Sequence, residues 1–326
     1  TQSRSSAASD VYKRQDKGCR IMKPNILLAG VTGYIGKNLI ESIKDEGILY
    51  TLSKYPKERE YKEIIWLEKD IYNYNDVLTA MEGIDIAIYY LDPTKHSAKL
   101  THATARDINL IAADNFGRAT AKQGVSKIIY ISGSRFDVET KRRLSAYGTE
   151  VEETTAQVAR PHVAVELQTS KYDDVRSALS IQLPMNWTLN QMVTYYFKWL
   201  DETKGTLLHT AKQGDNFIVY MKNKRNPILV LRKSKTEKDI ITLYLVSGSI
   251  VKPNLKKQGK LEFRKLKDTQ QVIVHLFDYI PKLTWPIYYL LQSPFQDLMM
   301  RGFEIDCRIK HYQGRINSGE NIKYTK

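Results

Sequence analysis

A glycine-spaced turn between an apolar run and an amphipathic run constrains the fold of this chain most. Residues 30–36 read Gly-Val-Thr-Gly-Tyr-Ile-Gly; they follow the strand-like run Ile26 to Ala29 and precede a helical pattern with Leu39, Ile40 and Ile43 on one face. The first glycine permits a tight turn, the second lets backbone N–H groups approach a pyrophosphate, and the third lets the helix pack closely on the strand. The turn therefore predicts a dinucleotide at the helix N-terminus, where the helix dipole favours an anion; a merely structural turn is the alternative.

The first half of the chain continues this alternation of short apolar runs and longer amphipathic runs. Such a rhythm is typical of βαβ units and of a parallel sheet. We expect strands over residues 26–29, 48–52, 64–67, 85–91 and 127–131, and a helix over 107–123 that ends at Gly124. The cofactor-binding residues that this turn supplies would be Gly30, Thr32, Gly33, Tyr34, Ile35 and Gly36.

After about residue 160 the rhythm changes to successive strand-like runs separated by polar turns. The runs cover residues 217–221, 227–231, 240–246, 260–263 and 272–277, and they predict a mostly antiparallel sheet in which helices are scarce. An apolar stretch over 283–300, interrupted by Pro286 and Pro294, predicts a closing helix. The fold class is therefore α/β: a Rossmann-type, doubly wound parallel sheet over residues 22–165, followed by a smaller α+β domain over 166–326 that we expect to shape a substrate or ligand site.

Composition excludes several classes of protein. Apolar residues make up 42% of the chain and charged residues 26%, which excludes a disordered or fibrous chain. The first 21 residues have no apolar core of a signal peptide and resemble translated adapter sequence, so we treat residues 1–21 as a non-native or disordered leader. Only Cys19 and Cys307 occur, the six histidines are scattered, and no apolar run is long enough to span a membrane. We expect a cytoplasmic protein without a metal site or a transmembrane segment.

Net charge is unevenly distributed along the chain. Residues 161–326 hold 26 Lys and Arg against 15 Asp and Glu, whereas residues 22–160 hold 19 of each. A lysine-rich solvated surface explains this excess more simply than an anionic partner does, because net charge bears on solubility before it bears on function. We therefore do not expect a nucleic acid partner.

The end of the second expected strand bears on which dinucleotide would bind. A site for NAD carries Asp or Glu there, to receive the ribose 2′-hydroxyl, whereas this chain has Ser53 and Lys54. A hydroxyl and an ammonium suit a 2′-phosphate, so the sequence favours NADP(H) over NAD(H), with Lys54 as the clamp. A surface lysine is the alternative.

Three segments together resemble the extended and atypical short-chain dehydrogenases. They are residues 30–36, Asp70-Ile71 after the third expected strand, and residues 130–134 at the fifth, and the resemblance covers roughly residues 24–170. Residues 87–91, 106–116 and 125–132 look like the NmrA-like and YbjT-like relatives within the NAD(P)-binding epimerase/dehydratase family. That resemblance implies that Asp70 and Ile71 border the adenine, and that Leu91 and Asp92 line the nicotinamide side of the cleft.

The catalytic set of the resembled family is incomplete in this chain. The family uses a Ser after the fifth strand and a Tyr followed four residues later by Lys, which lowers the phenol pKa so that the tyrosine can relay a proton. Ser132 or Ser134 stands at the serine position and Tyr147 lies 13 residues beyond Ser134, but Val151 replaces the lysine. Ser132, Ser134 and Tyr147 are therefore catalytic candidates in a relay that is not intact; Tyr147 as a packing residue is the alternative.

The second half loosely resembles the region attached to YbjT-like proteins, which looks like a START-type helix-grip fold. That resemblance implies an apolar cavity for a hydrophobic ligand, although Trp285, Tyr288 and Tyr289 read more simply as core. Peripheral membrane contact of residues 285–291 is a lesser alternative. Two functions remain: an NADP(H)-dependent oxidoreductase or epimerase-like enzyme of unknown substrate, which we favour on sequence, and a non-catalytic NmrA-like cofactor sensor.

Overall fold

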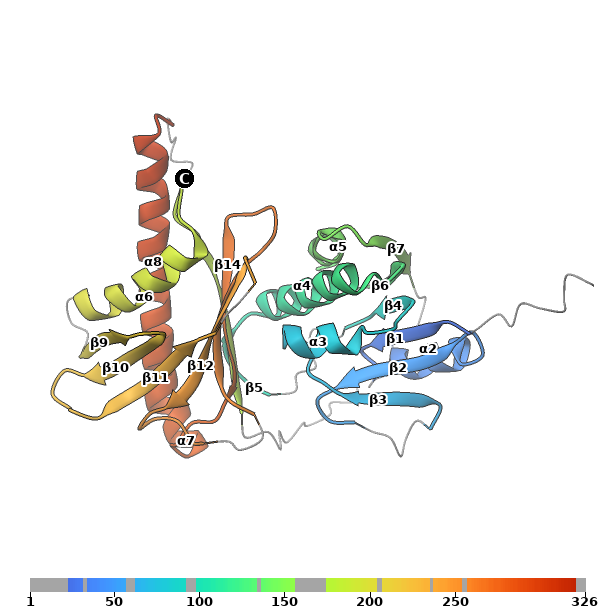
Figure 1. Ribbon diagram of the computed structural model, residues 1–326, viewed down its shortest axis with the longest axis horizontal. Helices are drawn as coiled ribbons and strands as arrows, with labels where there is room; N and C mark the ends of the chain where they lie inside the picture. The colour runs from blue at the N-terminus through green and yellow to red at the C-terminus, as the bar shows by residue number, and fades with distance from the viewer. Residues whose placement is uncertain are drawn as a thin grey trace, which may run out of the picture.

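The molecule consists of two sheets with their helices, lying side by side (Figure 1). The computed structural model describes residues 23–31, 34–56, 62–91, 98–133, 136–155, 174–203, 207–234, 237–253 and 257–320. The leader 1–21, the expected domain boundary near residue 165, and Thr32, Gly33, Asp92 and Ser134 lie outside the described residues.

The first sheet is parallel throughout and has the strand order β3-β2-β1-β4-β6-β7. Its strands are β1 (Asn25–Ala29), β2 (Ile48–Ser53), β3 (Ile64–Glu68), β4 (Ile86–Tyr89), β6 (Lys127–Ser132) and β7 (Glu150–Thr155). Strand order reverses between β1 and β4, which is the point where open sheets of this kind bind ligands. The predicted α/β class with a doubly wound parallel sheet is confirmed.

Helices cover both faces of this sheet. Helix α2 (Tyr34–Ile43) packs Ile40 against one face, in a cluster with Ile26, Leu28 and Ile88. Helices α3 (Tyr74–Ala80) and α4 (Ala105–Gln123) pack on the other face, and α5 (Asp137–Ser145) lies against α4. Thr104 caps α4 by accepting a hydrogen bond from the backbone N–H of Asp107, and Gly124 ends it at φ +71°.

The second sheet has the order β5-β8-β14-β13-β12-β11-β10-β9 and is antiparallel except where β5 meets β8. Its strands are β5 (Lys99–Ala103), β8 (Val175–Gln182), β9 (Leu208–Gln213), β10 (Asn216–Met221), β11 (Pro227–Lys233), β12 (Ile240–Ser247), β13 (Lys260–Lys265) and β14 (Gln271–Tyr279). The sequence did not indicate β5. This strand belongs to the first half of the sequence but pairs with β8 at the edge of the second sheet. The chain therefore crosses to the second sheet and returns through α4.

The expectation that helices are scarce after residue 160 was wrong. Helix α6 (Leu189–Glu202) begins at a capping box formed by Thr188 and Gln191. At the C-terminal end, α7 (Trp285–Ile287), the π-turn η1 (Tyr288–Gln292) and α8 (Ser293–Asn317) form one long helical segment. Pro286 and Pro294 are the second residues of α7 and α8, within the first turn, where proline is tolerated.

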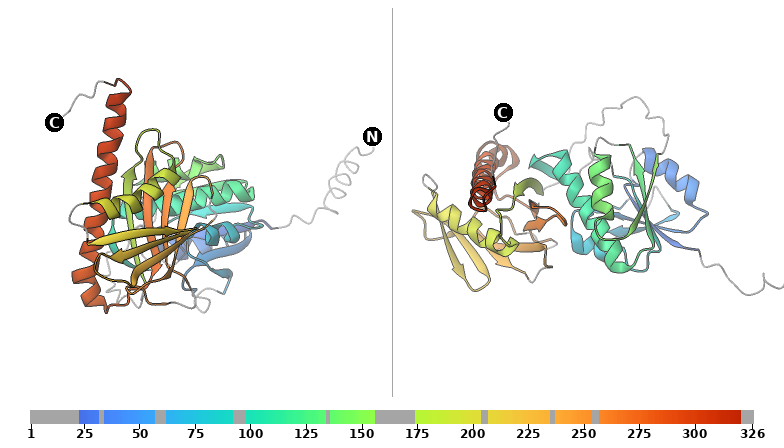
Figure 2. Two further views of the ribbon diagram at one scale, coloured as in Figure 1. Left: turned by 60° about the vertical axis from the view of Figure 1, so that its left-hand side comes forward. Right: turned by 90° about the horizontal axis from the view of Figure 1, so that it is seen from above.

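The second sheet buries both of its faces. One face packs against α6 and α8, with Phe197, Phe303 and Cys307 in its core. The other face turns towards α3 and α4 (Figure 2), so that Ala178 and Ile273 join the hydrophobic cluster of the first sheet. Helix α4 is therefore covered from two sides, which explains why its charged residues are buried as well as its apolar ones. Within the described ranges, no helix combines the length and the apolar character needed to cross a bilayer.

Candidate nucleotide-binding site

The glycine turn has, at its two ends, the backbone that its sequence predicts. Gly30 has φ +93°, and a Cβ there would lie 1.6 Å from the carbonyl oxygen of Tyr90, so no other residue fits. A Cβ on Gly36 would lie 2.2 Å from the carbonyl oxygen of Val31, which means that α2 rests directly on the turn. Tyr34 and Ile35 open α2, which begins at the carboxyl end of β1. This geometry fits a phosphate held at a helix N-terminus; binding itself remains a prediction.

Lys54, the expected phosphate clamp, is held by three carboxylates. Its Nζ lies 2.7 Å from an oxygen of Asp174, 3.3 Å from Asp278 and 3.9 Å from Asp70. Burial by itself lowers the pKa of Lys54, but the three negative charges outweigh burial and leave the pKa above its ordinary value. Asp174 directly precedes β8, and Asp278 lies within β14. Lys54 therefore joins the two halves of the molecule.

Ser53, its neighbour, closes a local turn. Its hydroxyl donates to the carbonyl oxygen of Tyr55 at 3.0 Å and accepts from the Tyr55 N–H at 3.2 Å. The hydroxyl is therefore engaged with its own backbone at the end of β2.

Asp70, expected beside the adenine, pairs instead with a buried arginine of the second sheet. Its carboxylate accepts from Arg176 Nη2 at 2.7 Å and from the backbone N–H of Tyr72 at 3.0 Å. Burial raises the pKa of Asp70, but Arg176 and Lys54 outweigh burial and hold it below its ordinary range. The Arg176 guanidinium lies 4.1 Å from the centre of the Tyr72 ring. The charges of Lys54, Asp70 and Arg176 therefore converge beside the residues expected to border the adenine.

Ile71 and Leu91, also assigned to the cofactor, pack against the hydrophobic cluster of the first sheet. Ile71 is buried, and its carbonyl oxygen accepts a hydrogen bond from Asn115 Nδ2 at 2.8 Å. Leu91 is half-buried against the cluster of the first sheet. Both lie at the carboxyl ends of strands, as the resemblance implies.

Tyr147 is bound to an aspartate and not to a lysine. Its hydroxyl donates to Asp114 Oδ1 at 2.6 Å, and Arg118 stacks on its ring at 4.6 Å. Burial and then the charge of Asp114 raise the pKa of Tyr147 far above its ordinary value. Ser132 is buried and makes a long contact of 3.4 Å to the carbonyl oxygen of Thr154. No interaction between Ser132 and Tyr147 is recorded among the described residues.

Asp114 is the centre of a second set of ion pairs between the two sheets. Its Oδ2 accepts from Arg264 Nη1 of β13 at 2.8 Å, and Arg264 also donates to Glu262 at 2.7 Å. All three side chains are almost fully buried. Burial raises the pKa of Asp114, whereas Arg264 and Arg118 outweigh it and keep the carboxylate charged. Tyr147 therefore belongs to a structural cluster that joins α4 to the second sheet.

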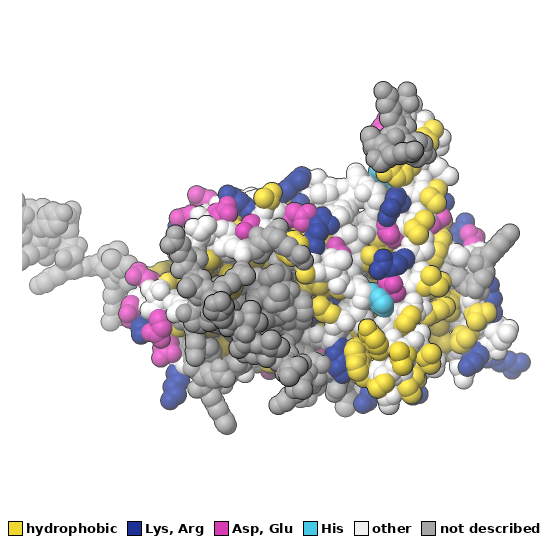
Figure 3. Space-filling model, turned by 180° about the vertical axis from the view of Figure 1, so that it is seen from behind, with side chains coloured by type: hydrophobic (Ala, Val, Ile, Leu, Met, Phe, Trp, Pro, Cys, Tyr) yellow, Lys and Arg dark blue, Asp and Glu magenta, His cyan; other side chains and the backbone are white. Residues whose placement is uncertain are grey.

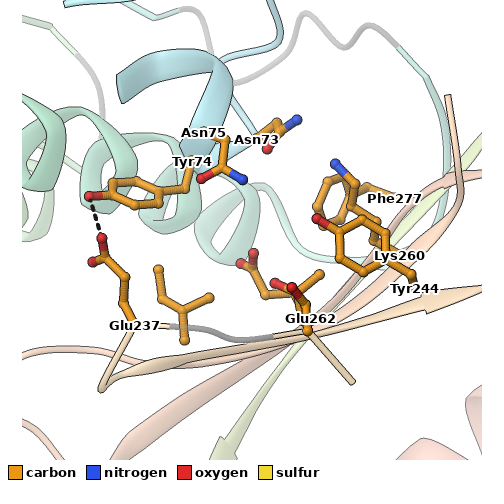
Figure 4. A pocket seen from close by; sticks show the side chains of 11 residues that line it. Asn73, Tyr74, Asn75, Glu237, Tyr244, Lys260, Glu262 and Phe277 are labelled. Carbon is orange, nitrogen blue, oxygen red and sulfur yellow. Dashed lines mark hydrogen bonds between the residues drawn. The ribbon is translucent and has the colours of Figure 1, made fainter. Parts of the chain in front are cut away.

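A small polar cavity lies beside this cluster, between α3 and the second sheet (Figure 4). Its volume is about 80 Å³, well below the roughly 300 Å³ at which small-molecule sites begin. Tyr74 donates to Glu237 at 3.1 Å on one side, and Tyr244, Lys260 and Glu262 line the other. The cavity has room for water but not for a dinucleotide.

Sequence reasoning missed every residue of the second sheet that faces α4. Arg176, Glu262, Arg264 and His275 all lie on that face and are buried. They alternate with apolar residues along their strands, a pattern that ordinarily marks a solvated face. The signal that could have revealed them is the matching row of buried polar residues on α4, at Asp107, Asp114 and Arg118.

This chain is similar to several known proteins. Residues 26–154 match the family described as NAD dependent epimerase/dehydratase family. The chain is 54% identical over 307 residues to the auxiliary protein GraX of Staphylococcus aureus, a match that covers 94% of this chain and 100% of that protein.

Among solved structures, a nucleoside-diphosphate-sugar epimerase of Staphylococcus aureus is 18% identical with a TM-score of 0.32, over 40% of this chain and 49% of that one. Pen from Bacillus thuringiensis is 25% identical with a TM-score of 0.27, over 35% of this chain and 38% of that one. The chain spans less than half of either solved structure.

Proposed function

This chain belongs to the family of the Staphylococcus aureus auxiliary protein GraX, and on that premise we propose that it is a non-catalytic auxiliary protein with an NAD(P)-binding domain of epimerase type. In this proposal the dinucleotide is a ligand that the protein senses. Of the two functions that the sequence left open, this is the cofactor sensor.

The observation that carries the proposal is the hydrogen bond from Tyr147 to Asp114. A proton-relay tyrosine needs a pKa lowered towards neutrality, which a neighbouring cation supplies. Tyr147 has Asp114 as its hydrogen-bond acceptor, Val151 in place of the relay lysine, and a raised pKa. Removing its proton would set a second negative charge beside Asp114 in a buried site, so the phenol stays protonated at physiological pH.

The residues that would hold a dinucleotide fit its pyrophosphate better than its adenosine end. Gly30 and Gly36 give the close approach of backbone that a pyrophosphate needs, and α2 begins beside them. When bound, the nicotinamide of such a group can accept or donate a hydride. Gly33 and Thr32 complete the proposed turn by sequence.

A preference for NADP(H) rests on Lys54, and the contacts of Lys54 weigh against it. A ribose 2′-phosphate would have to compete with three carboxylates that already neutralise the ammonium group. We therefore propose binding of NAD(P) without a strong preference for the phosphorylated form. If nucleotide binding moved the Lys54 side chain, its ion pairs with Asp174 and Asp278 of the second half would change. Nucleotide binding could in this way alter the conformation of the second half.

A hydrophobic ligand in the second half has less support. The space between the sheet and its helices is filled by aromatic contacts, such as Phe197 with Phe217 at 4.1 Å and Tyr196 with Phe303 at 4.9 Å between ring centres. Tyr288 is itself buried in that core. The helix-grip comparison therefore adds no ligand to the proposal.

Nucleotide consumption and nucleotide binding, measured separately, test the proposal. We expect binding of NAD(H) and NADP(H) by calorimetry, loss of that binding in Gly33→Asp, and retention in the control Gly83→Asp, because Gly83 lies outside the glycine turn, between α3 and β4, and an added Cβ there would have no neighbour within 4 Å. We expect no consumption of NADH or NADPH with carbonyls, quinones or nucleotide sugars. Turnover that falls about 100-fold or more in Tyr147→Phe would overturn the proposal and restore the oxidoreductase.

A further inference from the structure

A row of exposed apolar side chains runs along the C-terminal helical segment. Figure 3 shows hydrophobic side chains gathered over α7 and continuing up α8. The side chains that make up this row are exposed by between 41% and 68%, and they are Leu291, Phe295, Leu298, Ile305, Ile309, Tyr312 and Ile316. We call these seven residues the seam. A contiguous exposed apolar surface of this kind marks an interaction site.

The seam lies away from the face by which α8 packs on its own domain. Phe303 and Cys307 are fully buried against the second sheet and α6. A Cβ on Gly314 would lie 2.9 Å from Met185, so the helix is already in close contact on that side. The seam is thus a second apolar face, and each of its side chains stays at least 41% exposed in the described part of the chain.

The spacing of the seam identifies a helix as its occupant. From Phe295 to Ile316 the apolar positions alternate at intervals of three and four residues. The one interruption is Gly302, where an added Cβ would lie 3.2 Å from the Trp199 ring of α6. This is the heptad pattern of a coiled coil, in which positions a and d face a partner helix. A membrane-bound helix shows a wider apolar face than this row along α8.

The charges beside the seam favour a second copy of this chain in parallel. Arg301, Arg308 and Arg315 recur every seven residues at position g, and Asp306, Gln313 and Glu320 stand at position e. In a parallel pair each g residue meets the e residue five positions later on the other helix. Within one chain the three arginines pair with Asp297, Glu304 and Glu320, and Asp306 accepts from Tyr195. These contacts lie at the surface, and in a parallel dimer each arginine would face an acidic or amide side chain instead, whereas an antiparallel pair would set arginine against arginine.

We propose that this protein forms a parallel homodimer through the seam of α8. The interface is isologous, so the same row of side chains on each copy packs around one twofold axis. Arg301 would pair with Asp306 of the partner subunit, and Arg315 with Glu320 of the partner subunit. The dimer sets the two nucleotide-binding domains on the outside of a central helix pair.

Sedimentation analysis of the full chain tests the dimer. The wild-type protein should have twice the 37.6 kDa mass of one chain, and Leu298→Asp should weaken association by about 100-fold or more, because two carboxylates would meet in the seam. Leu207→Asp is the matched control, since Leu207 is 60% exposed and Leu298 62%, but Leu207 lies outside the seam. A wild-type monomer at every concentration, or an unchanged dimer in Leu298→Asp, would overturn the proposal.

Oxidative cross-linking tests the parallel arrangement. In a Cys19→Ser background, Leu298→Cys should form an intermolecular disulfide, because two d positions face each other in a parallel pair. Glu304→Cys, six residues along the same helix but outside the seam, should not. Cys307 is buried and does not compete. A dimer in which Leu298→Cys fails to cross-link would contradict the parallel pairing.

Discussion

The glycine turn and the surroundings of Tyr147 have diverged to different degrees from the pattern of the family. At the turn, Gly30 and Gly36 keep backbone contacts that no side chain can replace. Around Tyr147, the relay lysine is absent and the phenol has become a donor to a buried aspartate. A turn that packs a helix on a strand stabilises the fold even when no ligand binds. The lysine of a proton relay has no such structural role. The comparison indicates that the residues of the glycine turn and those of the proton relay can vary independently.

The largest effect is expected from Arg264, which joins the two halves through Asp114 and Glu262. Arg264→Met should lower the free energy of unfolding by about 3–5 kcal/mol, because two buried carboxylates lose their cation. Lys198→Met is the control: Lys198 pairs with Glu202 on an exposed face of α6, where such a pair contributes about 1 kcal/mol or less. Equal losses in urea unfolding would show that the Asp114 cluster is not structural.

A smaller loss is expected at the glycine turn. Gly30→Ala should cost about 2–3 kcal/mol more than Gly83→Ala, because both have positive φ but only Gly30 has a carbonyl oxygen within 1.6 Å of the added Cβ. Nucleotide binding should weaken only in Gly30→Ala. If thermal unfolding did not separate the two variants, the close approach at Tyr90 would be wrong.

Tyr147→Phe should cost about 2 kcal/mol, the contribution of a buried hydrogen bond to a charged group. The matched variant Tyr195→Phe also removes a phenol that donates to a carboxylate, at 2.8 Å from Asp306, but in a less buried setting, and should cost less. Denaturant midpoints compare the two. A Tyr147→Phe protein of unchanged stability would contradict a structural role for the hydroxyl.

The smallest effect concerns His275, which is buried between the two halves. Burial, followed by the charges of Arg176 and Arg264, lowers its pKa well below 6.5, and its ring stacks on Phe277 at 4.5 Å. Below pH 6.5 the unfolded chain binds a proton that the folded chain does not, so stability falls as the pH falls.

Replacing His275 with Leu should remove that contribution, which is about 1.4 kcal/mol per pH unit. The difference in unfolding free energy between wild type and His275→Leu, followed from neutral pH towards pH 5, measures it. Parallel curves would mean that the folded protein also protonates this ring.

Five of the six strands of the first sheet could be predicted because each is a short, largely apolar run, as β1 and β6 illustrate. Strand β7 was missed, because Glu150–Thr155 is a polar, mostly exposed edge strand. Strands β10 to β14 followed from their alternation. Strand β5 could not, because Lys99–Ala103 is a polar edge strand that owes its pairing to β8.

The contact between the second sheet and α4 could not be predicted, for a related reason. Alternating charges along β13 read as a solvated face, and only the charged side of α4 shows that they pair with another element. Likewise, the residue type of Lys54 suggested a phosphate clamp, whereas its three carboxylate partners lie 16 to 224 residues away in the chain. Contacts between distant segments decide the role of such a residue.

The ionisation of Tyr147 tests the central claim most directly. Tyrosine labelled with ¹³C at Cζ would be followed by NMR as the pH rises, with a dinucleotide present, and the Tyr147 signal assigned from the Tyr147→Phe variant. We predict that the phenol stays protonated beyond a pH of about 10, the ordinary pKa of tyrosine. Ionisation with a midpoint near neutrality would contradict the account, because it would mean that Tyr147 is poised for proton transfer after all.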